Sequence, residues 1–171
     1  FQVLKMGSWV IQPYILGISG IEHSRHDISY NDNTGVYTIT ADEENFKILH
    51  LTDIHLGGSF FSAVKDYKAL SACYKLIENT SPDLVIVTGD LVFPMGIMSF
   101  SLNNETPVMQ FAAFMRNIGI PWCFTYGNHD TEAMATGNRE NIDKLYKSLS
   151  YKSSGTLLYP YIQPDITGRS N

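Results

Sequence analysis

A chain of 171 residues, 44% of them hydrophobic, is long enough to fold as one domain with a substantial buried core. Its 17 acidic and 12 basic residues give a formal net charge of -5 without a block of like charge, which argues against a surface for nucleic acid or anionic membrane. The two cysteines, Cys73 and Cys123, are too few for a disulfide framework and are predicted to be buried thiols.

Residues 1–34 are predicted to form an N-terminal extension packed on the domain, and residues 35–171 to form the domain itself. The apolar stretch from Phe1 to Ile21 is interrupted by polar residues and proline, which argues against a membrane-spanning helix or a secretory signal. A remnant of a membrane anchor is the alternative for this stretch. Because the chain does not begin with methionine, we expect residues upstream of Phe1. The sequence predicts a cytoplasmic location and leaves membrane association and export open.

The first half of the domain is predicted to contain three strands and one helix. Two strands, at residues 36–40 and 46–52, flank a polar segment and are expected to pair as a hairpin. A helix follows over residues 61–79, because apolar residues recur there every three or four positions. The apolar side chains of this helix are Val64, Tyr67, Leu70, Tyr74 and Ile77. Residues 84–87 form a continuous apolar run, which predicts a strand covered on both faces.

The second half continues the alternation of helix and strand. A loop over residues 91–104 leads to a helix at residues 105–118, and the third core strand runs from residue 121 to 126. A further helix is predicted over residues 138–150 and a last strand over residues 156–161. Connections of this length join parallel strands through helices, so the fold class is α/β, a βαβαβ arrangement with mostly parallel central strands flanked by helices.

Two of the predicted core strands end in side chains that bind hard metal ions. Asp53 and His55 are separated by one residue, so an extended segment would direct both side chains to the same side, where they could hold one ion. Asp90 follows Gly89 at the end of the next strand, where a carboxylate could bridge two cations. Taken alone, each pattern is more often a surface pair or an ordinary turn.

The third core strand ends in a more specific group, Gly127-Asn128-His129-Asp130. The Asn128 carbonyl is a neutral oxygen ligand, His129 could protonate a leaving oxygen, and Asp130 could hold the imidazole in place. The three loops follow one another at nearly equal intervals along the chain. Since the carboxyl ends of parallel strands meet at one edge of a sheet, we expect the three loops to lie side by side.

The three motifs, in this order, resemble those of the calcineurin-like metallophosphoesterase superfamily, over residues 46 to about 149. The resemblance implies an α/β sandwich, of which this chain would be the N-terminal portion. It also implies a phosphoric ester hydrolase, acting on phosphomonoesters or phosphodiesters, in which a metal-bound hydroxide at a two-metal site attacks phosphorus. The substrate would be a small-molecule phosphate ester or a phosphoprotein.

The resemblance also assigns roles to individual side chains. Asp53 and His55 would bind the first metal ion, Asp90 would bridge both ions, and Asn128 would bind the second. The ions would be divalent or trivalent, namely manganese, iron or zinc.

Catalysis would rest on the last two residues of the third motif. His129 would be the catalytic residue that stabilises or protonates the departing alkoxide, and Asp130 its orienting partner. A non-catalytic interaction scaffold and a structural metal-binding domain are the alternative functions for a chain of this fold.

The chain departs from the family pattern in its histidines. The family has a further Gly-His pair and a Gly-His-x-His segment nearer the C-terminus, and the sequence contains neither. The second metal site is therefore incomplete, and we expect an N-terminal piece of a longer enzyme with little activity of its own. The apolar surface exposed at its sheet edge would promote self-association.

The remaining histidines receive no ligand role. His23 and His26 are predicted to be solvent-exposed loop residues, and His50 to be packed in its strand or to face a partner. The loop over residues 91–104 carries Phe93 and further apolar side chains, which would pack in the core or, alternatively, line a substrate pocket.

Overall fold

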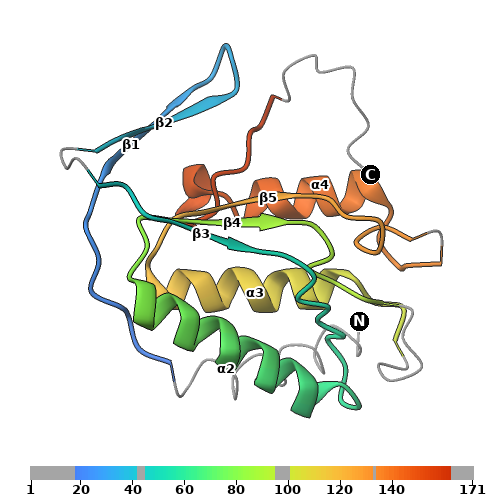
Figure 1. Ribbon diagram of the computed structural model, residues 1–171. Helices are drawn as coiled ribbons and strands as arrows, with labels where there is room; N and C mark the ends of the chain where they lie inside the picture. Colours follow the sequence, from blue (N-terminus) through green and yellow to red (C-terminus); the bar gives the residue numbers. More distant parts are fainter. Residues whose placement is uncertain (1–17, 42–44, 95–100, 133, 163–171) are drawn as a thin grey trace.

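The computed structural model of the chain describes residues 18–41, 45–94, 101–132 and 134–162. Two strands, β1 (Asp27–Asn31) and β2 (Val36–Thr40), form an antiparallel ribbon. A parallel sheet has the order β3 (Ile48–Leu51), β4 (Leu84–Thr88) and β5 (Trp122–Thr125). The helices are α2 (Ala63–Thr80), α3 (Glu105–Ile118), α4 (Arg139–Ser148) and a short 3-10 helix, η1 (Tyr151–Ser153). The α/β class and the parallel core strands are therefore confirmed (Figure 1).

The helices pack against one face of the parallel sheet. Val85 of β4 and Trp122 of β5 are paired in register and both are 0% exposed, so they point to the same face. Trp122 meets Phe111 of α3 with ring centroids 5.0 Å apart, and Phe124, on the same face, stacks on Tyr146 of α4 at 4.5 Å. Figure 1 shows α2 and α3 along this side of the sheet and α4 beside β5. The hydrophobic core lies between this face and the three helices.

The opposite face of the sheet is less covered by the described residues. Ile48 is 55% exposed, and Ile86 is partly buried where Val85, the residue before it, is fully buried. His50 and Thr88 are exposed and share a hydrogen bond of 2.5 Å between Nε2 and Oγ1. The prediction of a strand at β4 covered on both faces is thus wrong for the part of the chain that the structure describes, because only one face meets the helices. His50 belongs to the open face and is not packed in its strand.

The predicted hairpin between residues 36–40 and 46–52 does not form. β2 pairs with β1, and β3 pairs with β4. The turn from β1 to β2 is stabilised by the Asn31 side chain, which accepts hydrogen bonds from the N–H groups of Asn33 and Thr34. Gly35 completes this turn with a φ of 71°, a conformation that glycine adopts without a steric cost. The turn residues are visible in the sequence, but the short strand β1 before them lies within residues 1–34, which are predicted to form an N-terminal extension.

The helix α2 buries only part of the face that its apolar pattern predicts, since Leu70 and Ile77 are buried but the apolar residues of its first turns are not. Val64 and Tyr67 are 67% and 56% exposed, whereas Asp66 is 1% exposed. The Asp66 carboxylate accepts hydrogen bonds from the N–H groups of Gly57 and Gly58, each 2.9 Å long, and one from Ser62. Burial raises the pKa of Asp66, although these hydrogen bonds oppose the rise. The buried side of α2 therefore includes the Asp66 carboxylate, which binds the loop at Gly57 and Gly58, where apolar side chains alone were expected.

The last predicted strand, over residues 156–161, is reduced to single bridges at Leu157, which pairs with Trp122 and with Ser150. The two cysteines are Cys73, which is buried, and Cys123, which is half-buried. Burial raises the pKa of both thiols to about 11. The prediction of a buried thiol is confirmed for Cys73 and is only partly met by Cys123.

The N-terminal extension is described from residue 18 onward. Ile18 and Ile21 pack against the core, while the expected packing of residues 1–17 lies outside the described residues. His26 is not exposed as predicted. Its Nε2 lies 2.8 Å from Asp83 Oδ1, and the two side chains are 6% and 5% exposed.

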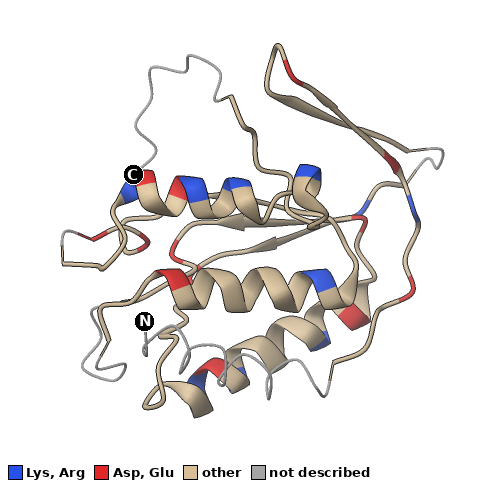
Figure 2. Ribbon diagram, turned by 180° about the vertical axis from the view of Figure 1, so that it is seen from behind, with Lys and Arg blue, Asp and Glu red and all other residues tan. Residues whose placement is uncertain are grey.

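Charged residues are dispersed over the described surface. Figure 2 shows acidic and basic residues interspersed along the ribbons of α2 and α4. Among the described residues, no helix has both the length and the apolar character needed to cross a membrane.

Candidate metal centre

The backbone of the sheet continues beyond its strands and brings the three polar loops together. Asp53 N–H donates to Gly89 O over 3.2 Å, and His55 N–H donates to Asp90 O over 3.0 Å. On the other side, a Cβ added at Gly89 would lie 2.6 Å from Gly127 Cα, so the second and third loops touch through two glycines. The predicted side-by-side arrangement of the loops is therefore present.

Three residues at this edge have an unusual backbone conformation. The φ angles are 54° for Asp53, 54° for His55 and 50° for Asp90, in the left-handed region that residues with a Cβ seldom adopt. The segment from Asp53 to His55 is therefore not extended, contrary to the expectation from the sequence. Nevertheless Asp53 Oδ1 lies 3.7 Å from His55 Nε2, so the two side chains are close enough to share one ion. Such strained residues are often found at functional sites.

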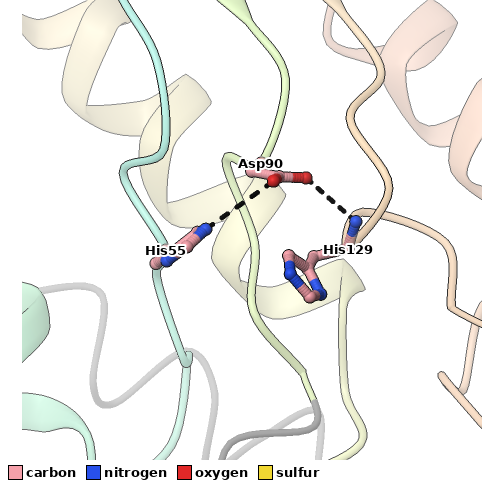
Figure 3. Close-up of side chains that lie close together, drawn as sticks. All are labelled: His55, Asp90 and His129. Carbon is pink, nitrogen blue, oxygen red and sulfur yellow. Dashed lines mark hydrogen bonds and ion pairs between the residues drawn. The ribbon is translucent and has the colours of Figure 1, made fainter. Parts of the chain in front are cut away.

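His55, Asp90 and His129 form the centre of the site. One possible ligand atom from each lies within 4.8 Å of the others. His55 Nε2 is 3.8 Å from Asp90 Oδ2, and Asp90 Oδ1 accepts a hydrogen bond of 2.9 Å from the backbone N–H of His129. Figure 3 shows that the three side chains come from three separate loops and gather around Asp90.

This donor set fits a metal ion. Two imidazoles and a carboxylate suit zinc, manganese or iron, and a single ion could reach atoms that are this close together. Asp53 adjoins the cluster but is 59% exposed, and its Oδ2 accepts a hydrogen bond from Thr52. Asn128 follows Gly127 in the third loop and is exposed. Among the described His, Cys, Asp and Glu side chains the geometry therefore offers one compact group of donors, with Asp53 at its margin.

Asp130 has a different place from the one its position in the motif predicts. It is 2% exposed, and its carboxylate accepts three backbone hydrogen bonds, from Gly127 (2.7 Å), Asp90 (2.9 Å) and Val92 (3.0 Å). Burial raises the pKa of Asp130, and the three N–H donors only partly oppose this. The carboxylate therefore joins the second loop to the third, and its hydrogen bonds do not go to the His129 imidazole.

The partner of the His129 imidazole is Glu132. Nδ1 of His129 lies 2.7 Å from Glu132 Oε1. Phe93 contacts the same imidazole edge to face, with ring centroids 4.6 Å apart, and stacks on His55 at 5.2 Å. No motif in the sequence points to Glu132, whereas Phe93 is one of the apolar loop residues predicted to pack in the core or to line a pocket. An acidic residue three positions after His129 was the available signal for Glu132, but its relation to the ring depends on how the loop folds.

Comparison with known proteins gives a consistent picture. The family described as calcineurin-like phosphoesterase matches residues 46–168. Phosphatase DCR2 of Saccharomyces cerevisiae is 32% identical over 121 residues, which cover 65% of this chain and 20% of that protein. Two proteins of Arabidopsis thaliana, probable inactive purple acid phosphatases 28 and 14, are 29% and 28% identical over 138 and 146 residues. These matches cover 74% and 78% of this chain and 33% of each plant protein, so the chain spans a third or less of these relatives.

Proposed function

The chain belongs to the calcineurin-like phosphoesterase family, and on this premise we propose that it contributes to the metal-dependent hydrolysis of phosphoric esters. The observation that carries the proposal is the convergence of His55, Asp90 and His129 from the ends of three parallel strands. Imidazole and carboxylate groups gathered at the carboxyl edge of such a sheet are suited to hold cations beside an anionic substrate.

His55 and Asp90 would hold the metal, with Asp53 and Asn128 completing the coordination of two ions. Manganese, iron and zinc all suit these donors. When bound, the ions would lower the pKa of a bound water and offset the charge on the phosphoryl oxygens. The substrate would be a phosphomonoester or phosphodiester, either a small molecule or a phosphoprotein.

The remaining residues of the site would orient and shield the reacting groups. The His129 imidazole would donate a proton to the leaving oxygen, a role in which a positioned acid commonly accelerates hydrolysis by about 100-fold or more. Phe93 contacts the imidazoles of both His55 and His129 and would restrict their movement. Asp130 fixes the loop that carries His129 relative to Asp90 through its hydrogen bonds to backbone N–H groups.

A second candidate function is a non-catalytic member of the same family, acting as an interaction scaffold or as a structural metal-binding domain. Two relatives have names that describe them as probably inactive. The exposure of Asp53 and Asn128 also favours this alternative.

Metal analysis coupled to an assay separates these functions. The chain, freed of metal by a chelator, would be titrated with zinc and with manganese and assayed on p-nitrophenyl phosphate and bis(p-nitrophenyl) phosphate. An enzyme binds metal and turns over at least one ester, and Asp90→Asn abolishes both properties. Asp27→Asn is the matched control, since Asp27 is an exposed residue of β1. Binding without turnover would favour a structural metal domain, and failure to bind either ion would favour the scaffold.

A further inference from the structure

We propose that Glu132 is the positioning residue of His129, the role that the sequence motif assigns to Asp130. The inference rests on the proposed function, because His129 needs a fixed orientation only if it transfers a proton or holds a ligand. Glu132 acts on the substrate through the imidazole and does not itself belong to the donor cluster.

The contact between the two side chains has the geometry of a charge-assisted hydrogen bond. The Nδ1 to Oε1 distance is 2.7 Å, and the side chains are 27% and 25% exposed, so the bond is partly shielded from water. An ionised carboxylate can only accept a hydrogen bond, which places a proton on Nδ1. The bond therefore selects the tautomer in which Nε2 is the nitrogen available to the site.

The imidazole is held on a second side by Phe93. The two rings meet at 88°, in the edge-to-face arrangement that aromatic rings prefer. The ring of His129 is thus restrained by Glu132 at Nδ1 and by Phe93 at its side. These two restraints come from different loops and together fix the direction of Nε2. Without them, the His129 side chain could rotate and Nε2 would point in several directions.

The other oxygen of Glu132 indicates that the contact serves something besides stability. Oε2 is buried and has no hydrogen-bond partner among the described residues. A buried carboxylate oxygen without a partner costs free energy, so a side chain chosen for folding alone would not be charged at this position. The turn itself is closed by the backbone, through the hydrogen bond of 2.8 Å from Ala135 N–H to Glu132 O. Substitution of the side chain therefore leaves the turn intact.

The chemical step has a simple balance. Attack of a water oxygen forms a new bond to phosphorus, and the protons of this water stay on the phosphate product. The bond from phosphorus to the leaving oxygen breaks with its electron pair on that oxygen. The proton on Nε2 passes to the leaving oxygen, and the imidazolium becomes a neutral imidazole. The Nδ1 proton stays in the hydrogen bond with Glu132 throughout the transfer.

Nuclear magnetic resonance of the metal-free chain, with histidine labelled by ¹⁵N, tests the contact directly. His129→Gln identifies the His129 signals among those of the five histidines. At a pH of about 8.5, where an ordinary imidazole is neutral, the wild-type ring should carry its proton on Nδ1. Glu132→Gln keeps a carbonyl acceptor and should keep this tautomer, whereas Glu132→Ala should shift it toward the Nε2-protonated form. Glu140→Ala, which removes an exposed carboxylate of α4, should change nothing. The proposal is overturned if the tautomer of His129 is the same in wild type and Glu132→Ala.

Kinetics with manganese then separates positioning from a purely structural role. A misdirected proton donor harms esters with poor leaving groups most, because good leaving groups depart without protonation. Glu132→Ala should lower kcat on glycerol phosphate by about 10-fold to 100-fold and kcat on p-nitrophenyl phosphate by less than about threefold, with KM unchanged. An equal loss on both esters contradicts positioning. If the wild-type chain hydrolyses neither ester, the proposed enzymatic function fails for this chain, and the tautomer measurement alone decides the role of Glu132.

Discussion

Replacing Gly127 with alanine would add a methyl group where the structure already places Asp90. The added Cβ would lie 2.1 Å from Asp90 Oδ1, 2.4 Å from its backbone N and 2.7 Å from its Cγ. Gly127 does not have a positive φ, so the backbone accepts alanine and the perturbation is purely one of space. Ordinary contact between carbon and oxygen requires the Asp90 carboxylate to move by about 1 Å, while metal ligands tolerate about 0.2 Å.

We therefore expect two measurable consequences of Gly127→Ala. The overpacked loop should lower the free energy of unfolding by about 1 to 3 kcal/mol, measured by urea denaturation followed by circular dichroism. Under conditions where the variant remains folded, zinc affinity from calorimetric titration should fall by about 10-fold or more.

Gly20→Ala is the matched control, because the nearest atoms to its added Cβ are at 3.7 Å. If Gly127→Ala has the same free energy of unfolding and the same zinc affinity as the wild type, the close approach of the loops at Gly89 and Gly127 does not set the position of Asp90, and the reasoning is refuted.

Three further changes test other parts of the structure. Asp83→Asn should lower the free energy of unfolding by about 1 to 3 kcal/mol at pH 7, because the carboxylate loses its charged hydrogen bonds to His26 and to a backbone N–H. Burial raises the pKa of Asp83, but these hydrogen bonds outweigh burial and hold the folded pKa below 3.8. The difference in unfolding free energy between wild type and Asp83→Asn should therefore be present above pH 3.8 and vanish as the pH falls through the folded pKa. Urea curves that differ equally at about pH 7 and pH 3 would disprove this. Phe93→Leu removes a ring that contacts two site imidazoles and should weaken zinc binding several-fold in calorimetry, with a loss of about 1 kcal/mol in folding stability; unchanged affinity would show that the ring does not hold them. Ile48→Lys places a charge on the open sheet face, and analytical ultracentrifugation should show less self-association than for the wild type, whereas equal association would place the contact elsewhere.

The secondary structure followed from local patterns wherever the pattern was long. The apolar run at β4 and the periodic apolar residues of α3 have no competing interpretation, and the helix bounds Glu105–Ile118 match the prediction. The pattern was less informative for α2, where a buried Asp66 replaces an apolar side chain. No periodicity rule anticipates a carboxylate that is buried because two N–H groups of a neighbouring loop need an acceptor.

The pairing of β2 could not be predicted from the residues within and next to the strand. The strand β2 has adjacent candidates on both sides along the chain, and the choice of β1 rests on the turn at Asn31 and Gly35. The order of the parallel strands was predictable, since helical crossovers of similar length place consecutive strands next to each other.

The sequence by itself determined that donors for a metal ion end three consecutive strands, because residue type and spacing are local properties of the chain. The tertiary structure decided which of those donors meet. Left-handed backbone angles turn Asp53 toward His55, and two glycines let the second loop approach the third. The contact of the His129 imidazole with Glu132, and not with Asp130, also belongs to the tertiary level, because which carboxylate reaches an imidazole depends on how a loop turns. Residue types can thus be read along the chain, whereas distances between side chains exist only after the backbone has folded.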